Sequence, residues 1–594
     1  MNRRAAPWQA RMFPKLVPEP THAPESAQTR MTVPPRKLRS NFPRGSYLWA
    51  VRNAQWQGMG IPESDCEKPK IAIVNSSSNM AACFSHLDAI VPVLKDAIRA
   101  AGAVPFEVRT TAPSDFIVGA GGRGGYILAS RDLVTNDIEA QVEGALLDGM
   151  VCLTSCDKTV PGQMMAAGRL NIPTLMVACG YQPSGHFEGE HVDIEDVFVG
   201  AMHAQVGYMD VERVVGMSRN AIRGPGVCSG MGTANSMHIA TEALGMALPG
   251  STPVAANSPA MWATVRAAGA RLVQMVWDDL KPRDVLTPGA FANAVRAVLA
   301  VGGSVNCIKH LQAVATESGC GADVYGLFES LGPVTPVLAG VRPVGDHVIE
   351  TFEAAGGCRA VMKQLLPLLD GAAMTVSGRT VADNMAGVAV ADPEVIRPLD
   401  RPIAQREAIT VLRGTLCPEF GIVKTGVAPR RTRRFSGPAI CFDAADKAIT
   451  ALKAGDIQPG HVVVMRGAGV CGGPGMGGGS SRVVFAIDGA GLGEQVAMLT
   501  DGHLSGLVCK GLVVAEVSPE GAVCGPLALV ADGDTITIDL DSRRCDLEVD
   551  AAVLEQRRTA WVPPKKQFDT GWLQIYRRNV GPLAEGAVLT REST

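Results

Sequence analysis

Apolar and polar positions over residues 69–177 follow two alternating patterns, and each pattern predicts its own kind of element. Short apolar, β-prone runs predict buried strands at 71–74, 104–108, 149–153 and 172–177. Apolar side chains at helical spacing predict helices at 87–101, 132–147, 162–170, 192–206, 232–247, 258–276 and 288–301. Strands separated by helices indicate a mainly parallel sheet. We therefore predict an N-terminal α/β domain over residues 36–385.

The pattern changes after residue 384, where Gly and Pro separate short β-prone runs and helical stretches become few. Strands are predicted at 408–412, 439–442, 461–465, 482–485, 511–515 and 535–539. We predict a mainly-β, barrel-like C-terminal domain over residues 400–585. Residues 1–35 are rich in Arg and Pro and lack hydrophobic periodicity, which favours a disordered or extended arm.

Composition narrows the classes of protein that fit this pattern. A chain of 594 residues is too long for one hydrophobic core. A net charge of -3 gives no sign of a nucleic-acid or acidic-membrane partner. No apolar run approaches the ~18 residues that a membrane span needs. The 15 cysteines are odd in number and follow no secretory signal, so reduced thiols in a cytoplasmic protein are expected.

Candidate chemistry is concentrated at the turn of residues 154–159, which lies between a predicted strand and a predicted helix. The carboxyl ends of strands are where ligands gather in open α/β sheets. Cys156, Asp157 and Lys158 offer a soft metal ligand, a hard one and an amine with an adjustable pKa. A surface turn with a chance charge pair and a buried cysteine would give the same three residues.

Two further cysteines occupy similar positions. Cys83 follows a predicted strand, and Cys228 lies in a glycine-rich loop before a predicted helix. Such loops expose backbone N–H groups, which suit sulfide or anionic ligands. Neither cysteine belongs to a Cys-x2-Cys cluster, so local spacing alone gives no metal signal and each could be structural.

Several long motifs resemble those of the dihydroxy-acid, sugar-acid and phosphogluconate dehydratase family. They appear in the family's order, over nearly the whole chain from about residue 40 to 585, at 153–162, 226–235, 302–306, 472–476 and 500–506. The resemblance implies an iron–sulfur cluster held by Cys83, Cys156 and Cys228. A 2Fe–2S cluster is favoured, and a 4Fe–4S cluster fits three cysteines as well. Three protein ligands leave one iron open, and an open iron is a Lewis acid that can bind a substrate hydroxyl.

The resemblance also implies a Mg²⁺ ion beside the cluster, with ligands at Asp115, Asp157 and Lys158. The family's lysine is carbamylated, which turns an amine into an anionic oxygen ligand for a hard cation. Because that modification needs a neutral amine, a lowered pKa is expected for Lys158. Without the resemblance, Lys158 would be read as a cation that balances Asp157.

The family's base maps onto Ser505, which would remove the proton at C2 of a hydroxy acid. Two departures stand out. His503 replaces an arginine of the family's loop, and imidazole cannot reproduce the bidentate fork of a guanidinium. Gly478 stands where a glutamate would complete the Mg²⁺ shell. Water, Ser480 or Ser481 could fill that place, or the ion could bind weakly.

Two classes of function follow from the resemblance. The first is a hydro-lyase that converts a 2,3-dihydroxy carboxylic acid to a 2-keto acid at a site between the two domains. An aldonate or a branched-chain dihydroxy acid would fit, and the departures favour polyhydroxy sugar acids. The second is a paralogue with a retained cluster and weak or lost chemistry, acting as a redox-responsive or regulatory binding protein. A small-molecule partner and a homodimer or homotetramer are expected in either case.

Overall fold

The computed structural model describes residues 37–112, 114–427, 432–563 and 570–589, and from Leu38 onward these form one compact unit. The arm predicted at 1–35 lies outside the described residues. The first described helix is α1 (Tyr47–Gly58). The division into domains at 36–385 and 400–585 stays a prediction, and the two main sheets are described in turn below.

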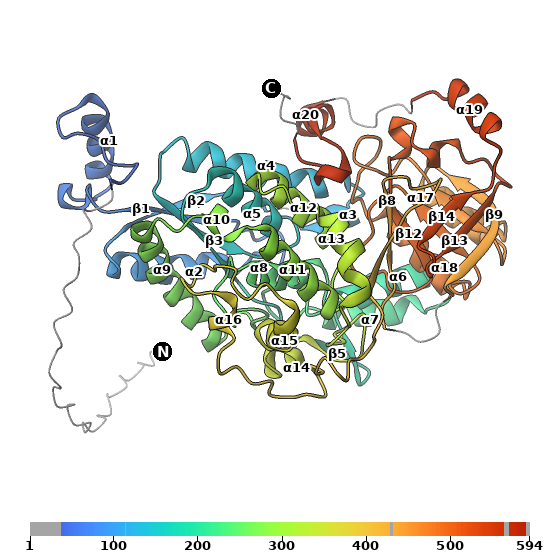
Figure 1. The fold of residues 1–594 in the computed structure, drawn as a ribbon, viewed down its shortest axis with the longest axis horizontal. Coiled ribbons are helices and arrows are strands. Elements are labelled where there is room, and N and C mark those ends of the chain that lie inside the picture. The colour runs from blue at the N-terminus through green and yellow to red at the C-terminus, as the bar shows by residue number, and fades with distance from the viewer. Residues whose placement is uncertain (1–36, 113, 428–431, 564–569, 590–594) are drawn as a thin grey trace, which may run out of the picture. The chain divides into compact units, whose positions relative to one another are not determined.

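The first sheet is parallel and four-stranded, with the order β2-β1-β3-β4, as the alternating pattern predicts (Figure 1). Its strands are β1 (Lys70–Asn75), β2 (Val104–Arg109), β3 (Gly149–Thr154) and β4 (Thr174–Ala178). Helices α2 (Leu87–Ala100) and α9 (Pro259–Asp278) pack together on one face, and α4 (Gly125–Val142) and α5 (Thr159–Leu170) pack on the other. Helix α4 starts earlier than predicted. The strands β1, β3 and β4 are buried along their whole length and form nearly continuous apolar runs, whereas the edge strand β2 is partly exposed.

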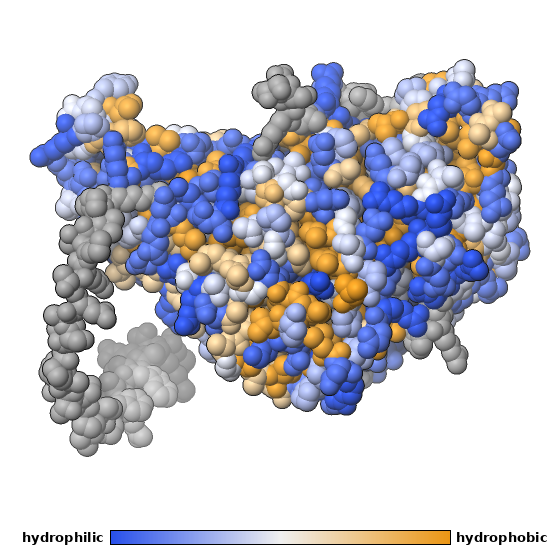
Figure 2. Space-filling model, viewed as in Figure 1, coloured by the Kyte–Doolittle hydropathy of each residue, from blue (hydrophilic) through white to orange (hydrophobic). Residues whose placement is uncertain are grey.

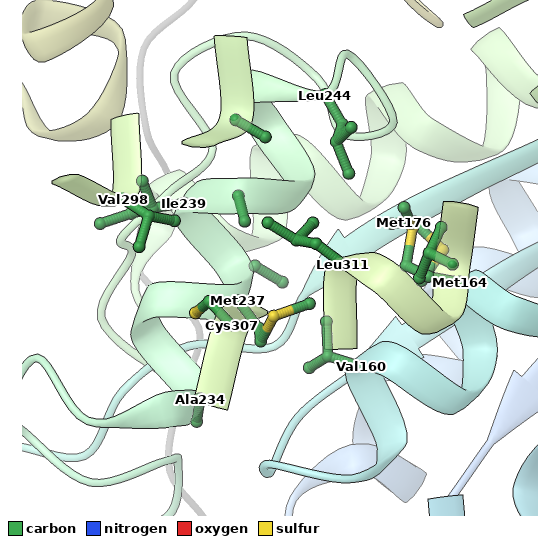
Figure 3. Packing of buried hydrophobic residues seen from close by; sticks show 14 of the residues in the cluster. Val160, Met164, Met176, Ala234, Met237, Ile239, Leu244, Val298, Cys307 and Leu311 are labelled. Carbon is green, nitrogen blue, oxygen red and sulfur yellow. The ribbon is translucent and has the colours of Figure 1, made fainter. Parts of the chain in front are cut away.

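A layer of helices extends the core beyond α5. The helices α8 (Thr233–Ala243), α11 (Pro288–Ala300) and α12 (Asn306–Ser318) pack against one another, and α8 and α12 also contact α5. Figure 3 shows Val160 and Met164 of α5 facing Leu311 of α12, with Met237 of α8 close by. The remaining helices before residue 385 are α3 (Asp115–Ala120), α6 (Ile194–Gln205), α7 (Val211–Asn220), α10 (Pro282–Val285), α13 (Val324–Leu331), α14 (Ile349–Ala354), α15 (Gly357–Leu365) and α16 (Val381–Asn384). A small hairpin, β5 (Gly185–Phe187) and β6 (Glu190–Val192), precedes α6.

The second sheet has eight strands in the order β14-β13-β9-β10-β11-β12-β8-β7. Its strands are β7 (Ile409–Leu412), β8 (Phe420–Lys424), β9 (Arg434–Phe442), β10 (Val462–Met465), β11 (Ala497–Thr500), β12 (Leu512–Ser518), β13 (Thr535–Asp539) and β14 (Arg544–Leu547). The four middle strands are parallel and the outer ones antiparallel. Arg413, directly after β7, donates its N–H to the carbonyl of Arg543 at 3.0 Å and accepts one from Cys545 at 2.9 Å. The two edges therefore nearly meet, which confirms the barrel-like prediction.

One predicted strand is wrong. Residues 482–485 lie in α18 (Gly479–Gly489), a helix that packs against α6. Val483, Val484 and Phe485 are all buried, so the segment lacks a polar face. A short apolar run cannot be assigned to a buried helix or a buried strand by periodicity alone. The other helices of this part are α17 (Ala445–Ala454), α19 (Ala551–Ala560) and α20 (Gly571–Asn579).

The surface is mixed in polarity. On the face in Figure 2, polar residues dominate, and apolar surface gathers in the lower middle, where Figure 1 shows α14 and α15. Among the residues that the structure describes, no helix is long and apolar enough to cross a membrane.

Candidate active site

The turn at residues 154–159 lies where the sequence predicts it, between the carboxyl end of β3 and the first residue of α5. Thr159 closes the turn, because both its backbone N–H and its hydroxyl donate to the carbonyl of Cys156, at 3.1 and 3.0 Å. Cys156 and Lys158 are buried, and Asp157 is partly exposed. The turn is therefore a fixed element of the interior rather than a surface loop.

The loops that carry Cys83 and Cys228 contact each other, and the Cys83 loop also contacts the turn that carries Cys156. Cys83 lies between β1 and α2, and its carbonyl accepts a hydrogen bond from the hydroxyl of Ser155. The loop that carries Cys228 is held to the Cys83 loop by Gly226, whose N–H donates to the carbonyl of Ala82 at 3.2 Å. The adjacent strands β1 and β3 run parallel, so their carboxyl ends lie at one edge of the sheet.

The thiols form a donor set that suits a cluster rather than a single ion. A hydrogen bond with Cys83, burial and nearby negative charge raise the pKa of Cys156 well above its ordinary value. Burial and the charge of Glu195 do the same for the pKa of Cys228. Among the described residues, His191, Asp193 and Asp196 form a group of potential ligands within 4.8 Å of one another, and the three cysteines do not. Three thiols without an imidazole or carboxylate among them are the type of donor set that iron–sulfur centres take.

The candidate Mg²⁺ ligands form a charge cluster in which Lys158 is buried and the two aspartates are partly exposed. The Nζ atom of Lys158 lies 2.9 Å from Oδ2 of Asp115 and 3.7 Å from Oδ2 of Asp157. Oδ1 of Asp115 is buried and has no hydrogen-bond partner. Burial raises the pKa of Asp115 to about 6, although the Lys158 ammonium opposes the shift. Two carboxylates, one of them with an orphaned oxygen, fit a hard cation.

The lowered pKa expected for Lys158 is wrong for the unmodified side chain. Burial alone would lower the pKa of the amine, but the charges of Asp115 and Asp157 outweigh burial, so the pKa is raised. An ammonium that pairs with two carboxylates holds its proton more tightly than a free one.

Ser505 and His503 lie in the loop that follows β11, and both side chains line the cavity described below. The backbone N–H of Ser505 donates to the hydroxyl of Ser481 at 2.8 Å, and its own hydroxyl accepts from the N–H of Leu507 at 3.3 Å. Both ring nitrogens of His503 are buried without a hydrogen-bond partner. Burial, and then the positive charges of Lys309, Arg131 and Lys158, lower the pKa of His503 well below its ordinary value. The ring is therefore neutral near pH 7 and lacks the charge of an arginine.

Gly478 opens the wall where a glutamate would stand. It has φ +76°, precedes α18 and has no atom within 4 Å of where a Cβ would lie. Of the proposed substitutes, Ser480 hydrogen-bonds Thr500 at 3.0 Å and Ser481 accepts from Ser505. Both serines are committed to the packing of α18, and neither is among the residues that line the cavity. They are therefore poor replacements for the missing carboxylate.

One cavity of about 650 Å³ brings the carboxylates, one of the thiols and the candidate base together, whereas Cys83, Cys156 and Lys158 do not line it. Residues that carry chemistry on its wall are Asp115, Asp157, Glu195, Cys228, His503 and Ser505. Much of the remaining wall is apolar and comes from α3 and α6, with Phe116 facing Phe198 edge to face at 6.1 Å. The cavity is thus lined by residues from both the N-terminal and the C-terminal parts of the chain.

Sequence reasoning missed Glu195. It lies in the first turn of α6, buried at 9% exposure, and burial raises the pKa of its carboxyl well above the ordinary value. The only local signal was an acidic residue on the helical face that also carries Phe198 and Met202, at spacings of three and seven.

Comparison with known proteins defines the class. Residues 68–384 match the N-terminal model of the dihydroxy-acid/6-phosphogluconate dehydratase family, and residues 394–587 match its C-terminal model. The chain belongs to this family of dehydratases, which are carbon–oxygen hydro-lyases.

Curated relatives cover almost the whole chain. It is 36% identical over 563 residues to the dihydroxy-acid dehydratase of Hydrogenobaculum sp. (strain Y04AAS1), a match that covers 93% of this chain and 100% of the relative. It is 38% identical to the dihydroxy-acid dehydratase of Methanococcoides burtonii, again over 93% of this chain and 100% of the relative. The dihydroxy-acid dehydratase of Methanothermobacter thermautotrophicus is 39% identical over 89% of this chain and 96% of its own length.

Proposed function

We propose that this chain dehydrates a 2,3-dihydroxy carboxylic acid to the corresponding 2-keto acid. The observation that carries the proposal is that Ser505 lines the same cavity as Asp115, Asp157 and Cys228. A proton acceptor and a set of metal-binding side chains therefore face one bound molecule. In the reaction, C2 loses a proton, the hydroxyl on C3 leaves as water, and the resulting enol gains a proton at C3 to become the keto acid.

Cys83, Cys156 and Cys228 would hold the iron–sulfur cluster, for which we favour 2Fe–2S over 4Fe–4S. Asp115, Asp157 and Lys158 would hold Mg²⁺. When bound, cluster and ion supply Lewis acidity toward the oxygens of the substrate. If Lys158 is carbamylated, the ammonium must first lose its proton, which the ion pair with Asp115 opposes.

Ser505 would accept the proton from C2. A serine hydroxyl is a weak base, and nearby positive charge is needed to stabilise its alkoxide. The N–H of Leu507 already donates to the Ser505 oxygen and would help to hold negative charge there. The neutral ring of His503 has a nitrogen free to donate one hydrogen bond to the substrate.

The lining of the cavity bears on substrate choice. Phe116, Ile117, Phe198 and Met202 present apolar surface that a polyhydroxy chain would leave without hydrogen bonds. This wall favours a dihydroxy acid with an apolar chain, such as a branched-chain acid, over the polyhydroxy sugar acids that the sequence favours.

The test is to incubate the anaerobically reconstituted protein with a branched dihydroxy acid and with a panel of aldonic acids, and to measure keto-acid formation. We expect keto acid, with the higher kcat/KM for the branched acid. A protein that binds iron and forms no keto acid from any of them would contradict the proposal. It would instead favour the redox-responsive or regulatory paralogue.

We also propose a homodimer or homotetramer. The exposed apolar side chains of α1, which include Tyr47, Leu48 and Val51, would be covered in such an assembly. Light scattering of the purified protein measures the state directly. A monomer at micromolar concentration would contradict this part of the proposal.

A further inference from the structure

The face of α6 that lines the cavity has one charged member. The cavity-lining residues of this helix are Ile194, Glu195, Val197, Phe198, Ala201 and Met202. Five are apolar, so the carboxyl group of Glu195 interrupts an otherwise apolar wall at the helix end nearest Cys228, whose thiol feels the Glu195 charge. We therefore ask which role, structural or functional, the carboxyl group has at this position.

Helix capping does not supply that reason. The N-cap is Asp193, which accepts from the N–H groups of Glu195 and Asp196, and Asp196 completes the capping box. Asp196 also pairs with Arg342 at 2.9 Å. No hydrogen bond or ion pair reaches the Glu195 side chain from the part of the chain that the structure describes. The carboxylate oxygens of Glu195 are not among the fully buried polar atoms without a partner, so they open onto the cavity, where a bound molecule can reach them.

The loop after Cys228 is shaped around this carboxyl group. A Cβ on Gly230 would lie 2.8 Å from Oε2 of Glu195, and a Cβ on Gly232 would lie 2.6 Å from Oε1. Neither glycine has a positive φ, so the backbone does not require glycine at either position. The two glycines provide room, and the room they provide is occupied by Glu195.

The same loop places Glu195 near the reacting end of the cavity. Gly232 is followed by Thr233, whose backbone N lies 3.4 Å from where a Cβ of Gly506 would be. Gly506 directly follows Ser505. The carboxyl group therefore lies against the loop that follows Cys228, and the same loop approaches the segment that carries the candidate base.

We propose that Glu195 is a substrate-binding residue whose carboxyl group hydrogen-bonds the 3-hydroxyl of the dihydroxy acid. The inference rests on the proposed function, since it needs a dihydroxy acid in the cavity. It adds a contact that holds the departing oxygen beside Cys228 while Ser505 meets the proton on C2.

The test compares two ligands in the cluster-loaded protein at fixed Mg²⁺, with Ser505→Ala in every protein so that the dihydroxy acid is bound and not consumed. One ligand is the 2,3-dihydroxy acid, and the other is its 3-deoxy analogue, a 2-hydroxy acid; calorimetry measures both Kd values, and their ratio is compared. We expect the protein with Glu195 intact to bind the dihydroxy acid at least ~10-fold more tightly, because a site built to hydrogen-bond a hydroxyl rejects a ligand that lacks it. Glu195→Leu should reduce this ratio by about tenfold. Glu195→Gln, which keeps a carbonyl acceptor, should reduce it less.

Controls separate binding from structure. Glu212→Gln removes an exposed carboxylate from α7 and should leave the ratio unchanged. Glu195→Leu should unfold at a higher temperature than wild type, because it replaces an unpaired buried carboxyl group with apolar surface.

The outcomes are distinct. An unchanged ratio in Glu195→Leu, or a weakened Mg²⁺ affinity with the ratio unchanged, overturns the inference while the proposed function stands. A wild-type protein that binds and dehydrates no acid overturns the proposed function, and the inference with it.

Discussion

The two walls of the cavity differ in kind. The wall built before residue 240 carries Asp115, Asp157, Glu195 and Cys228, while the wall built after residue 475 carries glycines, apolar side chains, His503 and Ser505. Arg482, the charged residue on the later wall, is paired with Asp446 at 2.8 Å. Candidate metal ligands are thus concentrated on the first wall, and the second contributes the hydroxyl of Ser505, the neutral ring of His503 and the shape of the cavity.

This difference predicts that substitutions on the two walls affect metal content and activity differently. Damage to the first wall should remove metal and activity together. Damage to the second should remove activity and leave the metal in place.

The largest effect is expected from Cys156→Ser. Losing one of three thiolate donors should remove the iron, the visible absorption of the cluster and all dehydratase activity together, since a hydroxyl is a poor ligand for iron–sulfur centres. Iron analysis and keto-acid assay check this. The matched control is Cys320→Ser, a partly exposed cysteine away from the cavity, which should keep both. An iron-free protein that still dehydrates its substrate would contradict the assignment.

Ser505→Ala should lower kcat by about 10²–10⁴-fold, the usual contribution of a positioned acid or base. Iron content and the visible spectrum should match wild type, because the change lies on the other wall. Ser218→Ala, which removes an exposed hydroxyl from α7, should have no effect. If the Ser505 variant also loses its iron, the separation between the two walls is wrong.

Mg²⁺ affinity should depend on pH through Asp115. With a pKa of about 6 in the metal-free protein, this carboxyl is protonated below pH 6, and the ion must displace that proton. Affinity should therefore be constant above about pH 7 and about tenfold weaker at pH 5. Titrations between pH 5 and 8 measure it. Asp115→Asn should bind more weakly at all pH values and lose this dependence; an equally steep dependence in that variant would contradict the role of Asp115.

The smallest effect is expected from Gly478→Glu. The space beside Gly478 is open, so a carboxylate can reach into the cavity and should tighten Mg²⁺ by about tenfold, or about 1.4 kcal/mol. The positive φ should cost about 1–2 kcal/mol of folding stability. Gly478→Ala carries the same strain without the carboxylate, so the difference between the two variants isolates the ligand. Equal Mg²⁺ affinities would show that the loop does not pass the ion.

The local pattern of apolar residues was enough to place the turn of residues 154–159. A buried strand is visible as a short apolar run, and the helix that follows it is visible as apolar side chains at helical spacing. The same pattern misassigned α18, where Val483 to Phe485 are buried without a polar face. Convergence of Cys228 on Cys83 depends on a backbone contact between two distant loops, and only the family motifs pointed to it. Glu195 depends on room made by glycines far along the chain, which no local signal records.

The central claim is that both walls act on one bound acid, and the cluster of the Ser505→Ala variant can report on it. The account predicts that adding the dihydroxy acid to the reconstituted variant changes the visible and electron paramagnetic resonance spectra of the cluster, as in wild type, while no keto acid forms. A variant whose cluster spectra do not respond to the acid, or which still forms keto acid at the wild-type rate, would contradict it.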